Sequence, residues 1–287
     1  MSNLRIFLIP NMDKAGAADY TSQIADKLFS LGCSCYADDY NSGMFSGEHI
    51  SFVPFDEIMP EIDVVITLGG DGTIIRSCKR IMPYRKKILG INIGRLGFLA
   101  DLEVHQLELL DRLVTGEYST EQRTMLHAQA NKDGTIQHFY ALNDVTVTTG
   151  GYIKIVDLEV YCNDRLSTTY RADGVILSTP TGSTGYAMSA GGPIIDPTID
   201  SIGLTPICPH SLFSRTILFA SNNVLTVRSK EINNSANVVL CIDGESVMTL
   251  SGQDSVTVTK ADTTMEFISL TGNSFCDMLN TKLLERR

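Results

Sequence analysis

Basic residues are scarce in this sequence of 287 residues. Lys and Arg together number 23 against 33 Asp and Glu, so the formal net charge is −10 and the isoelectric point is about 4.9. A protein that binds nucleic acid or an anionic membrane must first attract a polyanion with positive charge. The composition therefore argues against nucleic acid and against a membrane as the main partner.

Long apolar runs are also missing. No stretch approaches the roughly 18 consecutive apolar residues that would span a membrane. The segment 1–10 lacks the basic flank and long apolar core of a secretory signal. With 43% hydrophobic residues and no low-complexity tract, the composition is that of an ordinary globular protein. We therefore expect a folded protein of the cytoplasm.

Cysteine is present, but in a pattern that suggests neither disulfides nor a metal. The seven cysteines are an odd number, and the close pair Cys33 and Cys35 lacks a second pair to complete a zinc site. The five histidines have no metal-ligand spacing, and the HExxH, GxSxG and GxGxxG motifs are absent. We expect reduced, mostly structural cysteines and no metal site built from protein side chains alone.

The first 120 residues alternate strand and helix patterns. Continuous apolar runs at 5–9, 63–68 and 88–93 predict buried strands, and apolar residues at helical spacing follow each of them. The helix after the second run is expected from about Ile74 to Met82. Strands without polar alternation need cover on both faces, which is typical of a parallel sheet between helices. We expect residues 1–120 to form an α/β domain with a parallel sheet.

The pattern changes near residues 117–123. From there on, short runs rich in Val, Ile, Thr and Tyr are separated by turn signals such as Asp133-Gly134, Asn163-Asp164 and Asp243-Gly244. Residues 121–269 are therefore expected to form a mostly-β, sandwich-like domain. Apolar residues at helical spacing in 274–284 predict a last helix, and we expect residues 270–287 to pack back onto the first domain.

Glycines surround a single carboxylate at the end of the 63–68 run. The sequence Gly69-Gly70-Asp71-Gly72-Thr73 falls where a buried strand leads into a helix, and ligands of open α/β sheets collect at such points. A carboxylate repels bare phosphate, so Asp71 makes sense as a metal ligand or as the acceptor of a proton from a hydroxyl that attacks phosphate. A tight turn with Asp71 as a helix cap is the structural alternative.

A second segment is rich in hydroxyl groups. Residues 178–186 contain five Ser and Thr beside Gly182 and Gly185, and they offer many donors on a backbone that can wrap a ligand. The segment lacks the Gly-Lys-Ser/Thr ending of a Walker loop. A hydrophilic surface loop is the alternative explanation.

Three weaker features accompany these segments. Asn143-Asp144 ends an apolar run and fits either a ribose or adenine contact or an Asx turn. Arg171 and Asp173 precede the hydroxyl-rich segment, where they fit a phosphate and an amide or hydroxyl, or form an exposed ion pair. Six basic and no acidic residues occur between Arg76 and Lys87, a run that either attracts a nucleotide or is a solvated face.

The glycine-rich turn and the hydroxyl-rich segment, in this order, resemble the NAD kinase family. The resemblance extends to 92–99, 142–144, 171–174, 189–193 and 209–211 and covers about residues 3–275. It implies an N-terminal α/β and a C-terminal β-sandwich domain that bind nucleotide and NAD. It also implies a kinase that transfers the γ-phosphoryl group of ATP to the 2′-hydroxyl of the adenosine ribose of NAD, giving NADP, with Mg²⁺.

The resemblance also implies roles for individual residues. Asp71 would be the catalytic proton acceptor, Asn143 and Asp144 would hold adenosine or the nicotinamide ribose, and Asp173 would meet the nicotinamide amide. Gly185 stands where Ala is usual in the family. The NAD-binding set implied by the resemblance is Gly70, Asp71, Gly72, Thr73, Arg76, Phe98, Asn143, Asp144, Lys154, Arg171, Asp173, Thr181, Thr184, Gly185, Tyr186, Ser189 and Glu245.

Family members are commonly homodimers or homotetramers with sites shared between subunits, so we expect a homo-oligomer. Two other functions remain open on the residues. A related kinase could act on a lipid or a sugar, since a Gly-Gly-Asp-Gly turn recurs in such families. A non-catalytic NAD(P)-sensing module is the other, although binding alone gives no reason to place Asp71 beside phosphates.

Overall fold

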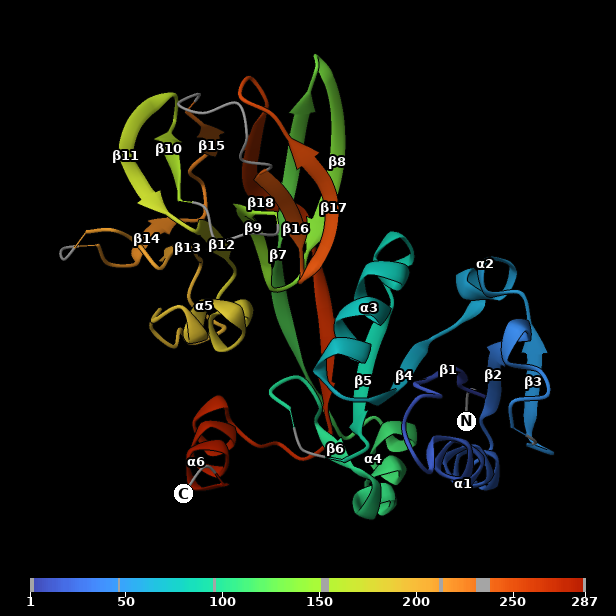
Figure 1. The fold of residues 1–287 in the computed structure, drawn as a ribbon. Coiled ribbons are helices and arrows are strands. Elements are labelled where there is room, and N and C mark those ends of the chain that lie inside the picture. Colours follow the sequence, from blue (N-terminus) through green and yellow to red (C-terminus); the bar gives the residue numbers. More distant parts are fainter. Residues whose placement is uncertain are drawn as a thin grey trace. The chain divides into compact units, whose positions relative to one another are not determined.

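The computed structural model describes residues 3–45, 47–94, 97–150, 155–211, 214–230 and 238–285. The chain forms two compact units (Figure 1). Unit 1 comprises 1–122 and 265–287, and unit 2 comprises 123–264. The chain passes between the units within β7 (Ser119–Lys132) and β18 (Ser255–Ser269).

Unit 1 is built on a parallel sheet in the order β5-β4-β1-β2-β3, and β6 and the last residues of β18 both pair with β5. All six residues of β4 are buried, because both faces of this strand are covered. The strands are β1 (Arg5–Pro10), β2 (Ser34–Asp38), β3 (Ile50–Val53), β4 (Val64–Gly69), β5 (Lys87–Asn92) and β6 (Leu102–Glu103).

Helices of unit 1 pack on both faces of this sheet. Ile6 and Leu8 of β1 pack in one core with Ile24 of α1, whereas Phe7 between them meets Phe55 of α2 edge to face at 5.3 Å. Adjacent residues of one strand therefore enter cores on opposite faces. The helices are α1 (Ala17–Ser30), α2 (Phe55–Ile58), α3 (Asp71–Ile81), α4 (Leu110–Thr115) and α6 (Phe275–Glu285).

Unit 2 is a β-sandwich. One sheet has the order β14-β13-β12-β9-β16-β17, and the other contains β11, β10, β15, β18, β7 and β8. Val145 and Val175 of the first sheet share one core with Leu158 and Val227 of the second. The remaining elements are β8 (Thr135–Ala141), β9 (Asp144–Thr149), β10 (Val156–Cys162), β11 (Arg165–Ala172), β12 (Gly174–Ser178), α5 (Tyr186–Ser189), β13 (Ser201–Ile207), β14 (Ile217–Ala220), β15 (Leu225–Ser229), β16 (Val238–Ile242) and β17 (Glu245–Leu250).

Two-residue turns connect three of the hairpins in unit 2. Asp133-Gly134, Asn163-Asp164 and Asp243-Gly244 all have positive φ at both positions. Such turns match the right-handed twist of the flanking strands and favour Asn, Asp and Gly. The turn signals in the sequence are thus confirmed at these three places.

The predicted fold class is confirmed, with one correction to a helix boundary. The expected strands are β1, β4 and β5, and α4 ends before Gly116, which has φ 79°. Helix α3 begins at Asp71 rather than at Ile74, because Gly70 accepts hydrogen bonds from the amides of Thr73 and Ile74. Among the described residues no helix is long and apolar enough to cross a membrane.

Candidate functional site

The turn after β4 holds one carboxylate in a fixed position. Asp71 is the first residue of α3, and its Oδ2 accepts the backbone N–H of Phe98 at 2.8 Å while its Oδ1 accepts that of Leu99 at 3.1 Å. Both donors lie in the loop that follows β5. Two amides on one carboxylate fix its orientation, and the half-buried side chain stays accessible to a ligand.

The helix-cap explanation of Asp71 does not agree with this geometry. The N-cap of α3 is Gly70, and no side chain caps the helix there. The Asp71 carboxylate bonds to another loop instead of to its own helix. Its position at a helix N-terminus after a buried strand is the arrangement that suits phosphate chemistry.

Close packing shapes the rest of this turn. A side chain at Gly69 would overlap Thr73, whose hydroxyl accepts a hydrogen bond at 3.0 Å from the Asn11 amide. Thr73 is buried, whereas Gly72 and Arg76 are exposed on the outer side of α3. Gly72 and Arg76 can therefore meet a ligand, and Thr73 supports the turn from beneath.

The basic run between Arg76 and Lys87 is partly used inside the protein. Arg80 pairs with Asp38 and lies over the Phe55 ring, with 3.6 Å from its guanidinium carbon to the ring centroid. Lys86 donates to a backbone carbonyl, and Lys87 lies 3.6 Å from a Glu266 carboxylate oxygen. Of the predicted nucleotide-attracting run, the exposed Arg76 and Arg85 are better placed to meet a ligand.

Unit 2 brings together a second group of the predicted residues. Asn143 and Asp144 form the corner between β8 and β9, and the backbone N–H groups of 142–144 all donate to Asp243. Asp144 is buried and accepts the Thr146 hydroxyl at 3.1 Å. The buried Oδ1 of Asn143 accepts no hydrogen bond from the described residues, which leaves an acceptor for a ligand donor.

The hydroxyl-rich segment packs directly on this corner and is not a loose surface loop. Thr181 and Ser183 are buried in a 3₁₀ turn over Thr181–Thr184, and the Ser183 hydroxyl exchanges hydrogen bonds with the backbone of Ile195. A side chain at Gly182 would overlap the backbone of Asn143. The segment and the corner therefore pack closely against each other.

Tyr186 lies among acidic groups at the same place. Burial raises the pKa of its phenol, and nearby Cys208, Asp144, Asp173 and Cys241 raise it further. The tyrosine hydroxyl thus stays protonated, in the company of the Asp144 and Asp173 carboxylates. Such a set of acceptors suits a ligand that carries hydroxyl and amide donors.

The other predicted residues are placed less tightly. Arg171 is exposed and Asp173 half-buried, and among the described residues no ion pair joins them. Thr184 and Gly185 are half-buried, and Ser189 and Glu245 are exposed. Lys154 lies outside the described residues.

Three residues that support the site were not singled out from the sequence. In the sequence, Asp243 is only part of a turn signal, Gly97 only part of a stretch of family resemblance, and Thr179 only one member of the hydroxyl-rich segment. Gly97 lies against Asp71, and a side chain there would overlap its carboxylate. No local sequence pattern indicates that a turn residue binds a distant corner, so only the tertiary contacts reveal the role of Asp243.

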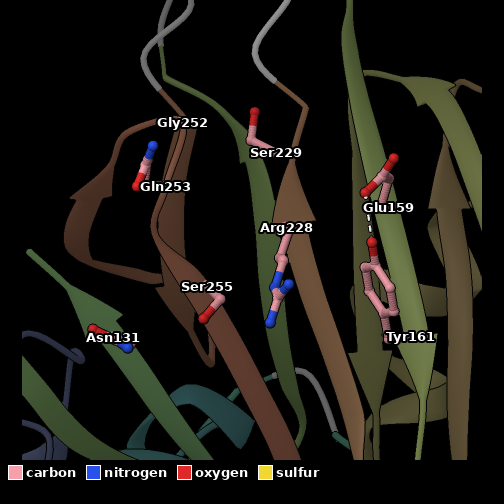
Figure 2. A pocket seen from close by; sticks show the side chains of 8 residues that line it. All are labelled: Asn131, Glu159, Tyr161, Arg228, Ser229, Gly252, Gln253 and Ser255. Atoms are coloured by element: carbon pink, nitrogen blue, oxygen red, sulfur yellow. Dashed lines mark hydrogen bonds between the residues drawn. The ribbon is translucent and has the colours of Figure 1, made fainter. Parts of the chain in front are cut away.

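A polar cavity of about 470 Å³ opens elsewhere on unit 2 (Figure 2). In it the Tyr161 hydroxyl donates to Glu159 at 2.8 Å, and the Arg228 guanidinium lies 5.2 Å from the centroid of the Tyr161 ring. None of the residues predicted to bind NAD lines this cavity. Across the described part of the chain, no group of three or more His, Cys, Asp or Glu could hold a metal ion.

Family models match both units of the chain. The ATP-NAD kinase N-terminal domain matches residues 6–118, and the ATP-NAD kinase C-terminal domain matches residues 142–270. The NAD kinase of Natranaerobius thermophilus is 37% identical over 279 residues, which is 96% of each chain. The NAD kinase of Symbiobacterium thermophilum is 38% identical over 278 residues, 96% of this chain and 97% of its own.

Solved structures agree in fold. A crystal structure of yeast NADH kinase complexed with NADH has a TM-score of 0.88 at 22% identity, covering 99% of this chain and 88% of that one. An NAD kinase from Archaeoglobus fulgidus in complex with ATP has a TM-score of 0.72 at 23% identity, covering 93% and 94%. The matched models span both units, and the relatives align over nearly the whole length. The chain therefore belongs to the ATP-NAD kinase family.

Proposed function

We propose that this protein is an NAD kinase that transfers the γ-phosphoryl group of ATP to the 2′-hydroxyl of the adenosine ribose of NAD. The observation that supports this reaction most directly is the Asp71 carboxylate, held by the amides of Phe98 and Leu99 at the start of α3. A ribose hydroxyl is a poor nucleophile at neutral pH, and a positioned carboxylate can accept its proton.

The proposed step balances as a direct transfer. The O2′–P bond forms while the bond between the γ-phosphorus and the ADP oxygen breaks, the hydroxyl proton passes to Asp71, and ADP leaves with the electron pair. The N-terminus of α3, the exposed Gly72 and the guanidinium of Arg76 supply donors for phosphate oxygens. Positioning and charge neutralisation are the main requirements of phosphoryl transfer.

Unit 2 supplies the binding groups for NAD in this proposal. Asn143 and Asp144 hold a ribose or the adenosine, Asp173 meets the nicotinamide amide, and Tyr186 lies with Thr184 and Ser189 along the adenine. Phe98 of unit 1 is proposed to lie near that adenine. Arg171 and Lys154 are proposed phosphate contacts, with Thr181, Gly185 and Glu245 as further contacts to NAD.

A magnesium ion fits this site only as a partner of the phosphates. Mg²⁺ in kinases is held by one or two carboxylates together with phosphate oxygens and water. Asp71 is a carboxylate whose two oxygens each accept one amide and keep a further lone pair. We propose that Asp71 would help to hold the Mg²⁺ of ATP, and the ion would neutralise phosphate charge there.

The proposal also includes a cytoplasmic homodimer or homotetramer, in which Asp173 reaches the NAD site of a neighbouring chain. Edge strands such as β14 and β17 need protection, which an oligomer can provide. Sedimentation at assay concentration tests the assembly. An active monomer contradicts it.

The test of function is an assay with purified protein, Mg²⁺, ATP and NAD, in which NADP is measured with an NADP-specific dehydrogenase. Parallel reactions replace NAD by NADH, by a diacylglycerol or by a sugar, and ATP by polyphosphate. We expect NADP formation above a blank without enzyme. Folded protein that phosphorylates only a lipid or sugar, or nothing, rules out the proposal.

A further inference from the structure

The corner between β8 and β9 presents three consecutive backbone N–H groups to one carboxylate. Oδ1 of Asp243 accepts from Asn143 at 2.7 Å and from Asp144 at 3.0 Å, and its Oδ2 accepts from Leu142 at 3.1 Å. Hydrogen bonds from amides to an ionised carboxylate are stronger than those between neutral groups. Asp243 thus accepts a hydrogen bond from every backbone amide of residues 142–144.

The carbonyl groups of the corner are bound as well. The Thr179 hydroxyl donates to Leu142 at 2.6 Å, the Thr179 amide donates to Asn143 at 2.8 Å, and the Asp243 amide donates to Asp144 at 2.9 Å. All six backbone polar groups of 142–144 therefore have partners, and Thr179 and Asp243 supply them. A backbone held at every polar group has little freedom to shift.

The Thr179 hydroxyl links this corner to the hydroxyl-rich segment. It accepts the Gly182 amide at 2.9 Å while it donates to Leu142. Gly182 in turn lies so close to Asn143 that a methyl group would overlap its backbone. A displacement of the corner therefore moves the segment 181–184 with it.

We propose that Asp243 is a positioning residue for NAD, which sets the place of Asn143 and Asp144 without binding NAD itself. Its two oxygens accept the three amides of the corner. This inference rests on the proposed function, because it takes Asn143 and Asp144 as the groups that contact NAD. Asp243 acts on substrate binding, whereas Asp71 acts on the chemical step.

The substitution Asp243→Asn tests the proposal. Asp243 has φ 48°, a conformation that Asn tolerates, so the turn itself is preserved. The amide NH₂ of Asn must face at least one backbone N–H of the corner, which leaves that donor without an acceptor. We expect the KM for NAD to rise about 10- to 100-fold through displacement of the binding groups. The kcat and the KM for ATP should stay close to wild type, because uniform binding is what is lost.

Asp254→Asn is the matched control. Asp254 also accepts two backbone N–H groups, from Ser251 at 2.7 Å and Asp133 at 3.1 Å, together with the Ser251 hydroxyl at 2.9 Å. It lies in unit 2 at the β17–β18 turn, and it holds none of the predicted NAD-binding residues. We expect Asp254→Asn to lower the melting temperature but to leave the KM for NAD unchanged. An equal rise in both variants, or a wild-type KM in Asp243→Asn, overturns the proposal.

A second pair of variants keeps the test valid if Asp243→Asn does not fold. Thr179→Val removes the hydroxyl that joins Leu142 to Gly182, and Thr179→Ser retains it. We expect a raised KM for NAD in Thr179→Val and a near-normal value in Thr179→Ser. Equal values in the two contradict the positioning of this corner.

Calorimetric binding of NAD without ATP separates this inference from the proposed reaction. A wild type that binds NAD but forms no NADP contradicts the reaction alone, and weaker binding by Asp243→Asn then still supports the positioning role. Equal affinities of wild type and Asp243→Asn contradict the positioning role while leaving the reaction intact. A wild type that neither binds NAD nor forms NADP removes both.

Discussion

The carboxylate of Asp71 fills the space that a side chain at Gly97 would occupy. A Cβ atom at Gly97 would overlap both carboxylate oxygens, and the next two residues, Phe98 and Leu99, donate their amides to the same oxygens. Residues 97–99, in the loop after β5, thus pack closely around the Asp71 carboxylate. The carboxylate can take this position because residue 97 has no side chain.

Gly97→Ala should therefore impair the chemical step. The three atoms nearest to the added methyl group would all belong to the Asp71 carboxylate, so alanine acts first on this side chain. A catalytic group displaced by about 1 Å can cost on the order of 100-fold in rate. We expect kcat to fall by about this amount while the KM for NAD stays close to wild type. Steady-state kinetics with NAD as the varied substrate measure both.

The control compares the effect of Gly97→Ala on stability in the wild-type chain with its effect in the Asp71→Gly variant. We expect Gly97→Ala to lower the melting temperature in the wild-type chain and to have little further effect in Asp71→Gly, because the overlapping carboxylate is then gone. Residues in contact show this kind of non-additivity. The same loss in both backgrounds means that Asp71 is not the obstacle.

Asp71→Asn tests the proton acceptor itself. Asn has nearly the same volume but cannot accept the hydroxyl proton, so kcat should fall roughly 10²- to 10⁴-fold while NAD affinity changes less than about tenfold. Its NH₂ group also faces one of the amides of Phe98 and Leu99, so the melting temperature should fall as well. Partial rescue by added Mg²⁺ would indicate that Asp71 mainly holds the metal, and near-normal turnover would remove Asp71 from the mechanism.

NAD should protect one cysteine and leave another unaffected. Cys208 is exposed and lies near Tyr186. Burial raises the pKa of the Tyr186 phenol most, and the charge of Cys208 raises it further. Cys276 is exposed on α6 in unit 1. We expect NAD to slow maleimide modification of Cys208 but not of Cys276, as followed by peptide mass spectrometry. Protection of both or of neither contradicts the placement of NAD beside Tyr186.

The buried thiols should be inert in the same experiment. Burial, followed by the charges of Cys33 and Asp26, raises the pKa of Cys35 to about 12. The reactive form of cysteine is the thiolate, so Cys35 should not react at neutral pH. Rapid modification of Cys35 in folded protein would show that unit 1 opens at this site.

The hairpin of β7 and β8 should weaken in mild acid. Burial and the neighbouring His138 lower the pKa of His127 below 6.5, and Asp262 opposes this shift. Because the pKa of His127 is lower in the folded state, its contribution to stability is present above the unfolded pKa of about 6.5. This contribution is lost as the pH falls through the folded pKa. We expect the melting temperature to fall between about pH 7.5 and pH 5.5, and less steeply in His127→Gln.

The control for this pH dependence is His105→Gln. His105 is exposed in unit 1, whereas His127 and His138 lie on a hairpin of unit 2. His105→Gln should retain the wild-type slope of melting temperature against pH. A wild-type slope in His127→Gln, or an altered one in His105→Gln, contradicts the assignment to His127.

Local patterns along the chain determine much of the fold. Buried strands β1, β4 and β5 show in the sequence as apolar runs because both of their faces are covered, and the hairpin turns show as Asp-Gly and Asn-Asp pairs because they need positive φ. Strands β2 and β3 escaped prediction, because they are short and mix buried with half-exposed residues. The apolar pattern predicts the start of helix α3 three residues late, since the first turn of this helix is made of polar residues and glycine.

The sequence by itself also determined the family and the candidate residues Asp71, Asn143 and Asp144, because their motifs are continuous along the chain. Only the tertiary structure showed what holds them. Asp71 is fixed by a loop beyond the next strand, and Asn143 and Asp144 are fixed by Asp243 from a distant hairpin. Hydrogen bonds between segments far apart in the chain leave no local periodicity, so the sequence indicates only a turn at a residue such as Asp243.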